Sequence, residues 1–276
     1  MTYFFNQFKT AMLMALMFAV VLAIGSAWGT TGLIIAFVIG GAMNVIAYFQ
    51  SDKIAIATMR GKEADARTAP DLIAMVQRLA QNAEIPMPRV YVCPQQAPNA
   101  FATGRNPKNA AVAVTQGALA LLTYDELEGV MAHELAHVKN RDTLISTIAA
   151  TMAGAISFLA TMAFWFGGSS RDGNPLVMLL TMIFAPVAAM LIQMAISRSR
   201  EYVADAEGAR IAGTPVGLMN ALQKLEATAK RVPMANETPS QNHMFIVQPL
   251  TGAGLASLFS THPPTADRVA KLRELM

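Results

Sequence analysis

Four long runs without a charged side chain most constrain how this chain can fold. They are residues 11–28, 32–50, 143–170 and 176–197. Each is long enough to cross a hydrocarbon layer about 30 Å thick as a helix. The composition agrees, because 54% hydrophobic and 14% charged residues make a chain more apolar than an ordinary soluble protein. We therefore expect four transmembrane helices, grouped as the hairpins 11–50 and 143–197, with the polar Asn44 facing protein rather than lipid.

Basic residues beside these runs predict the orientation. One side of a four-helix topology carries Lys9, Lys53, Arg60, Lys62, Lys139, Arg141, Arg198 and Arg200, and the other side carries Arg171. Because positively charged flanks stay in the cytoplasm, we expect both termini and the soluble segments 52–142 and 198–276 to be cytoplasmic. A cleaved signal peptide is the alternative for residues 11–28. That run is long for the apolar part of a signal peptide, and a second run follows almost at once.

A short motif in the first soluble segment predicts a metal site. His133, Glu134 and His137 form the pattern H-E-x-x-H, with which zinc peptidases hold their metal. Two histidines four residues apart lie on one face of a helix, where both can reach a single ion. The glutamate lies beside the ion, where it can take a proton from a bound water and pass it to the leaving amine. Thr123 and Glu126 predict a capping box at the start of this helix.

The surrounding residues favour a metal site over a chance pair of histidines. An apolar stripe at helical spacing is formed by Tyr124, Leu127, Met131, Leu135 and Val138. His133 and His137 fall on the opposite face, so neither is expected to serve as core filler. The alternative is a coincidental pair of solvated histidines.

A catalytic zinc site needs a third protein ligand from elsewhere in the chain. An extended pattern with a third histidine is excluded, because Asn140 and Thr143 occupy its glycine and histidine positions. We expect Glu201 to be the ligand, since Glu201 and Asp205 share one helical face and Asp205 can hold the second ring nitrogen of a histidine. The alternative is that this pair only caps and solvates a helix.

The soluble segments predict a mainly α fold with a small β-sheet. Helices are expected at residues 69–82, 199–212 and 215–230, and short hairpin or edge strands at 89–93, 99–103 and 110–115. Residues 233–242 are polar and rich in turn formers, which suggests a lid or a self-cleavage site. Cleavage specificity and oligomeric state do not follow from these patterns.

Four segments together resemble the HtpX-type membrane zinc peptidases, which are relatives of the CAAX prenyl proteases. They are VMAHELAHVKNRD at 130–142, SREYVAD at 199–205, NAFATG at 99–104 and THPP at 261–264. The resemblance implies a gluzincin-like domain with one Zn²⁺ per chain, bound by His133, His137 and Glu201, with Glu134 as the base. It also implies a bacterial inner-membrane location and the degradation of damaged or misfolded membrane proteins.

Three further residues receive roles from this resemblance. Asn99 begins a segment that resembles the edge strand beside the substrate cleft, and an edge strand can pair with an extended peptide. A plain hairpin rim is the alternative. His262 and Arg268 resemble a C-terminal motif whose side chains lie near the zinc and stabilise the oxyanion, but two prolines followed by a helix also suit a structural cap.

Other classes of function fit the residues less well. The basic residues are scattered, so we expect protein or peptide substrates and a lipid bilayer as partners, and no nucleic acid. A transporter would place ionisable residues within its spans, and none of the four runs contains one. A prenyl-protein protease of the resembling family would need more spans than four. A zinc-binding scaffold without peptidase activity stays open, although it would not require Glu134.

Overall fold

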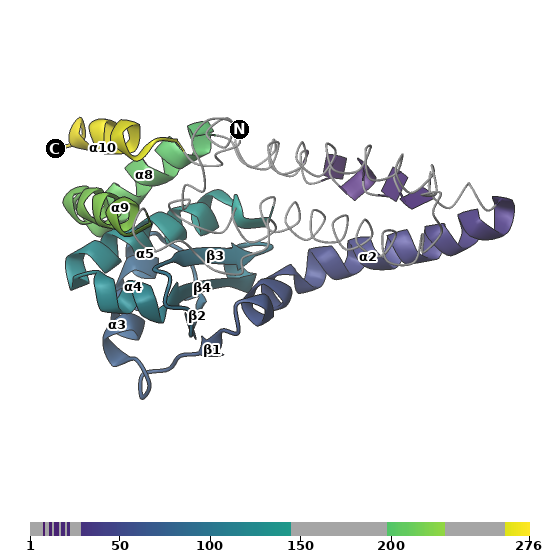
Figure 1. The fold of residues 1–276 in the computed structure, drawn as a ribbon, viewed down its shortest axis with the longest axis horizontal. Coiled ribbons are helices and arrows are strands. Elements are labelled where there is room, and N and C mark those ends of the chain that lie inside the picture. Colours follow the sequence, from purple (N-terminus) through teal and green to yellow (C-terminus); the bar gives the residue numbers. More distant parts are fainter. Residues whose placement is uncertain are drawn as a thin grey trace, which may run out of the picture.

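Helix α2 (Gly29–Thr58) extends away from a body of helices packed on a small sheet (Figure 1). The computed structural model describes residues 29–144, 198–229 and 263–276, together with scattered positions between 8 and 22. The body contains β1 (Lys62–Glu63), α3 (Pro70–Asn82), β2 (Arg89–Cys93), β3 (Ala100–Gly104), a 3₁₀ turn (Pro107–Asn109), β4 (Ala110–Thr115), α4 (Gln116–Leu121), α5 (Tyr124–Asn140), α8 (Arg198–Ala212), α9 (Val216–Ala229) and α10 (Thr265–Arg273). The predicted combination of many helices with a small sheet is confirmed.

One helix in the described part of the chain is long and apolar enough to cross a membrane. It is the Gly29–Gln50 part of α2, with a mean hydropathy of 2.1. The Asn44 side chain donates a hydrogen bond to the carbonyl of Met14 over 3.2 Å, and the rings of Phe18 and Phe37 lie 5.3 Å apart. These contacts pair the first apolar run with α2 in opposite directions, as in a hairpin, and they confirm that Asn44 faces protein. All of 145–197 lies outside the described residues, so the run 176–197 and all of the run 143–170 except its first two residues lie outside them.

The second half of α2 joins the apolar span to the sheet. The helix does not end at Gln50 but continues for eight further residues to Thr58. Ala55, Ile56 and the following Met59 are buried against the sheet residues Tyr91, Cys93, Phe101, Ala111 and Ala113. The predicted soluble segment therefore starts with a helical extension that fixes the sheet next to the span.

Strand β4 lies in the centre of a four-stranded sheet with the order β1-β2-β4-β3. It pairs in parallel with β2 and antiparallel with β3. All six residues of β4 are buried, because Val112 and Val114 face the helices while Ala111 and Ala113 face α2. The three predicted strands are confirmed. The expectation of simple hairpins is wrong for β2, since the chain crosses over to β3 and returns between the two strands.

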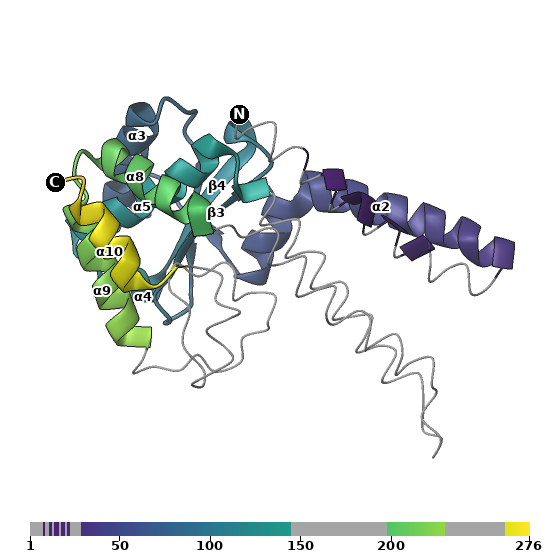
Figure 2. The same ribbon diagram turned by 90° about the horizontal axis from the view of Figure 1, so that it is seen from above.

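The helices α3, α5, α8, α9 and α10 contribute to one apolar core on the other face of the sheet (Figures 1 and 2). Helix α5 begins with the predicted capping box: the Thr123 hydroxyl accepts the Glu126 N–H, and the Glu126 carboxylate accepts the Thr123 N–H. The alternative of a solvated pair of histidines on α5 does not hold. His133 is only 1% exposed, whereas Tyr124 of the apolar stripe is exposed. Neighbouring helices cover the histidine face, so the predicted site is buried.

Candidate metal centre

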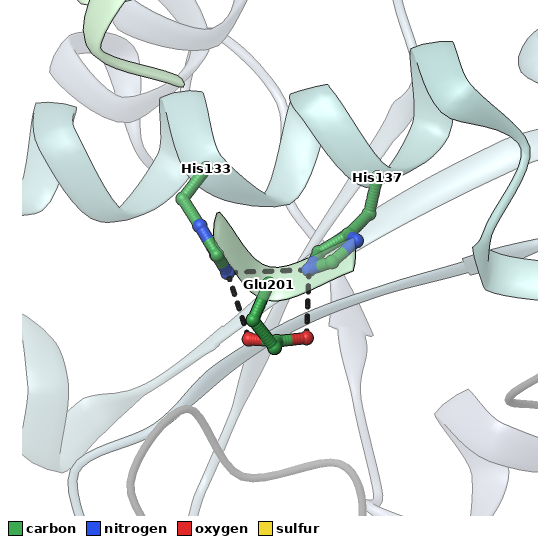
Figure 3. A group of neighbouring side chains, drawn as sticks. All are labelled: His133, His137 and Glu201. Atoms are coloured by element: carbon green, nitrogen blue, oxygen red, sulfur yellow. Dashed lines mark hydrogen bonds and ion pairs between the residues drawn. The ribbon is translucent and has the colours of Figure 1, made fainter. Parts of the chain in front are cut away.

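The structure brings His133, His137 and Glu201 together between α5 and α8 (Figure 3). The Nε2 atoms of the two histidines lie 3.2 Å apart. Glu201 Oε2 lies 3.7 Å from His133 Nε2, and Oε1 lies 3.5 Å from His137 Nε2. Zinc bonds of about 2.0–2.2 Å in tetrahedral geometry place neighbouring donor atoms about 3.3–3.5 Å apart. The three side chains could therefore hold a metal ion.

A close approach of two helices allows Glu201 to reach the histidines. Gly208 lies two turns after Glu201 on α8 and faces the backbone of His133. A Cβ atom at this position would lie 2.9 Å from the Cα and 3.0 Å from the N atom of His133. Only glycine permits this separation, because backbone atoms cannot move aside as a flexible side chain can.

Each histidine has a carboxylate near its other ring nitrogen. Asp205 Oδ1 lies 3.0 Å from His133 Nδ1, where Asp205 was expected to hold a histidine. Asp142 Oδ2 lies 3.3 Å from His137 Nδ1. Such carboxylates orient a histidine for metal binding. Asp142 was missed from the sequence, because a helical count from His137 does not predict its position beyond the end of α5.

Arg268 joins α10 to the metal centre. Its side chain is 1% exposed and donates two hydrogen bonds to Asp205, of 2.8 Å from Nε and 2.6 Å from Nη2. Its Nη1 lies 3.8 Å from Glu201 Oε2. Burial alone would raise the pKa of Asp205, but the guanidinium outweighs it and lowers this pKa to about 2. Arg268 thus holds Asp205 in its charged form.

The charges of the centre also suit a divalent cation. The buried carboxylates are Glu134, Asp142, Glu201 and Asp205, and the buried guanidinium groups are Arg200 and Arg268. Metal ligation needs neutral imidazoles. The four carboxylates then outnumber the two guanidinium groups by two negative charges when Glu134 is ionised, and by one when it is protonated. Burial alone would lower the pKa of His137, but the hydrogen bond to Asp142 and the charge of Glu201 raise it to about 9. The site therefore attracts positive charge.

Glu134 lies beside the histidines and against strand β3. Burial raises the pKa of its carboxyl to about 7. The backbone N–H of Ala102 donates a hydrogen bond to this carboxylate. That N–H lies on the outer edge of β3, which in the described residues pairs only with β4. A buried carboxyl with a pKa near neutrality suits the transfer of protons in both directions.

The comparison with known proteins identifies the family. The model of peptidase family M48 matches residues 66–276. The chain belongs to peptidase family M48. It is 55% identical to a protease HtpX homolog from Desulfatibacillum aliphaticivorans, over 97% of this chain and 89% of that one. It is 54% identical to the protease HtpX homolog of Salinibacter ruber, over 98% of each chain. The resemblance to HtpX-type peptidases is confirmed.

A solved structure shares the fold of this M48 chain. It is the crystal structure of S. mikatae Ste24p, with a TM-score of 0.53 and 18% sequence identity. The match covers 98% of this chain and 66% of that one, so Ste24p contains a further third that has no counterpart here. The fold alone follows from this likeness.

The remaining predicted site residues of this M48 chain have different outcomes. Asn99 precedes β3, and its buried backbone N–H donates to Thr115 Oγ1 over 2.9 Å. It lies just before β3, the strand that borders Glu134. Its role in substrate binding stays a prediction. His262 lies outside the described residues, as does the loop 233–242. Arg268 reaches the site, where its side chain contacts Asp205 and Glu201.

Proposed function

We propose that this M48 chain is a zinc endopeptidase of the bacterial inner membrane, which hydrolyses peptide bonds of damaged or misfolded membrane proteins. The observation that carries the proposal is the spacing of His133, His137 and Glu201, with the buried Glu134 next to them. Two imidazoles and one carboxylate are the ligand set of several zinc peptidases. We infer one Zn²⁺ per chain.

The side chains divide the reaction between them. His133, His137 and Glu201 would hold the zinc ion, which when bound would lower the pKa of a water molecule and polarise the substrate carbonyl. Glu134 takes the proton from the attacking water and then delivers it to the nitrogen of the leaving amine. The Asp205 carboxylate orients the ring of His133, and Arg268 holds that carboxylate in place and in its charged form. His262 is assigned as the donor to the anionic tetrahedral intermediate.

The outer edge of β3 is the proposed binding surface for the substrate backbone. An extended peptide that pairs with an edge strand gains main-chain hydrogen bonds, which are independent of its side chains. This mode suits an enzyme that degrades many unfolded substrates. Asn99, at the start of the strand, is assigned to the same surface.

The position of this edge supports substrates from the membrane. Arg105, directly after β3, donates a hydrogen bond over 3.4 Å to the carbonyl of Phe49, near the end of the apolar span. The Thr143 hydroxyl donates over 2.8 Å to the carbonyl of Gly104, the last residue of β3. The strand is thus fixed beside the place where the chain leaves the apolar layer. We infer four spans, in the hairpins 11–50 and 143–197, with the catalytic segments 52–142 and 198–276 in the cytoplasm.

The test combines zinc content with cleavage of an unfolded protein. The full-length protein in detergent is compared with Glu134→Gln and Glu201→Gln. We expect about one zinc per wild-type chain, retained zinc but a loss of cleavage of about 10²–10⁴-fold in Glu134→Gln, and loss of zinc in Glu201→Gln. Full cleavage by Glu134→Gln would contradict the proposal and favour a zinc-stabilised membrane scaffold that carries a contaminating protease.

A further inference from the structure

Asp142 contacts His137 because of the way α5 ends. Arg141 has left-handed backbone angles, with φ of 59°, and turns the chain back onto the last helical turn. The Asp142 N–H then donates to the His137 carbonyl over 3.0 Å, while its carboxylate reaches the same residue's Nδ1 at 3.3 Å. Asp142 is 4% exposed. The backbone and the side chain of Asp142 therefore both bind to one metal ligand.

The other carboxylate oxygen of Asp142 faces Arg200 on α8. Arg200 Nη1 lies 3.7 Å from Asp142 Oδ1. Arg200 is 9% exposed, and burial lowers the pKa of its guanidinium, while the charges of Asp142 and Glu201 oppose that shift. A buried guanidinium is costly unless it faces a negative charge. At 3.7 Å the contact is an ion pair and not a hydrogen bond, and both of its side chains are buried rather than solvated.

The Asp142–Arg200 pair joins two distant parts of the chain. Asp142 lies before residues 145–197, and Arg200 follows them, so the pair connects the two ends of that segment. Thr143, next to Asp142, is also tied to Gly104 of β3 by its 2.8 Å hydrogen bond. The Asp142 carboxylate thus contacts both His137 and the Arg200 side chain of α8. The next residue, Thr143, is bound to the end of β3.

We propose that Asp142 is a positioning residue for the ligand His137, and that Arg200 acts on metal binding through Asp142. The inference rests on the proposed zinc site and adds to it a connection from the ends of segment 145–197 to one ligand. Arg200 fixes the carboxylate, the carboxylate fixes the ring of His137, and the ring presents Nε2 to the metal. A change in the spacing of the two segment ends then alters the metal affinity.

The sign of the effect separates this inference from simple charge repulsion. Arg200 is a cation close to a cation site, so through-space electrostatics alone predict that its removal tightens metal binding. A positioning role predicts the opposite, because the Asp142 carboxylate loses its support. Arg200→Gln therefore distinguishes the two explanations, whereas Asp142→Asn weakens metal binding under both.

The experiment measures zinc affinity of the full-length protein in detergent, by competition with a chelator. Asp142→Asn is expected to weaken zinc binding about 10- to 100-fold, as for other groups that orient a metal ligand. Arg200→Gln is expected to weaken it about 3- to 10-fold, and to add little further in the Asp142→Asn background, because both act on one path. Glu207→Gln is the control, since Glu207 pairs with Lys139 across the same two helices without contact to a ligand.

A spectroscopic measurement excludes a merely structural role. In the cobalt-substituted protein, Asp142→Asn and Arg200→Gln are expected to shift the visible absorption bands, whereas Glu207→Gln leaves them unchanged. Wild-type zinc affinity in Asp142→Asn overturns the positioning role. Tighter zinc binding in Arg200→Gln overturns the connection through Asp142. So does an effect of Arg200→Gln that is undiminished in the Asp142→Asn background. If Asp142→Asn does not fold, Arg200→Gln decides alone. A wild-type chain that binds no zinc refutes the proposed function as well.

Discussion

Helices α8 and α9 both pack against α5, but the side chains buried on α9 are apolar, whereas α8 buries charged side chains as well as apolar ones. Helix α9 contributes apolar residues, namely Leu218, Met219, Ala221, Leu222 and Leu225. Helix α8 contributes the charged Arg200, Glu201 and Asp205. Apolar burial stabilises a fold directly, whereas buried charge is costly unless a partner or a metal compensates it. We infer that the contact of α5 with α9 mainly stabilises the fold, whereas its contact with α8 forms the candidate metal centre.

The largest expected effect concerns the apolar contact. Leu222 is fully buried in the core, and Leu222→Ala should lower the free energy of unfolding by about 2–5 kcal/mol through lost burial and a cavity. Chemical denaturation of the full-length protein measures this loss. Gln223→Ala, on the exposed side of α9, is the control and should change stability little. If the contact between α5 and α9 serves stability and not the metal centre, the folded Leu222→Ala variant still binds zinc with wild-type affinity.

Gly208→Ala should affect the charged contact. The added Cβ would meet the His133 backbone at about 3 Å, so α8 must move away and carry Glu201 with it. We expect a loss of about 1–3 kcal/mol in stability together with weaker zinc binding. The helical Gly41 has nothing within 4 Å of an added Cβ, which makes Gly41→Ala the matched control. Unchanged zinc affinity in Gly208→Ala would show that the ligand geometry does not depend on this close approach.

The zinc affinity of the site should depend on pH, whereas the stability that comes from the apolar contact between α5 and α9 should not. The pKa of His137 is raised to about 9, so at neutral pH zinc must displace a proton from this ring. The apparent affinity should therefore fall as the pH decreases below 9, by up to about tenfold per pH unit. Chelator competition at several pH values measures it, with correction for protonation of the chelator. An affinity that is constant from about pH 7 to about pH 9 would contradict the raised pKa.

The smallest effect is expected at the surface pair between α5 and α8. The Glu207 carboxylate lies 2.8 Å from Lys139 and also binds Arg210. The hydrogen bond from Arg210 is the largest cause that lowers the Glu207 pKa to about 2. Stability from this group is present above its ordinary pKa and is lost as the pH falls towards 2. Because the pair is partly exposed, Glu207→Gln should cost less than about 1 kcal/mol at neutral pH, measured by denaturation. A larger loss would show that α8 also depends on its surface charges.

Local patterns predicted the elements that carry the site. The Thr123 capping box marked the start of α5, and the short apolar run 110–115 marked strand β4. The run was expected as a hairpin or edge strand, so its position inside the sheet was not predicted. The two-residue strand β1 and the short helix α4 were missed, because they are too short for a periodic pattern. The motif also placed His133 and His137 on one helical face, a relation that depends only on residues one turn apart.

The sequence by itself determined the histidine pair, the neighbouring Glu134, the apolar span and the family, since each depends on short motifs or composition. Only the tertiary structure decided that the histidine face is buried, that Asp142 lies beside the ring of His137, and that Arg268 binds Asp205. Those contacts join residues on different helices or beyond a helix end. Their formation depends on the closeness of α8 to α5 and on one left-handed residue, and no local periodicity encodes either feature.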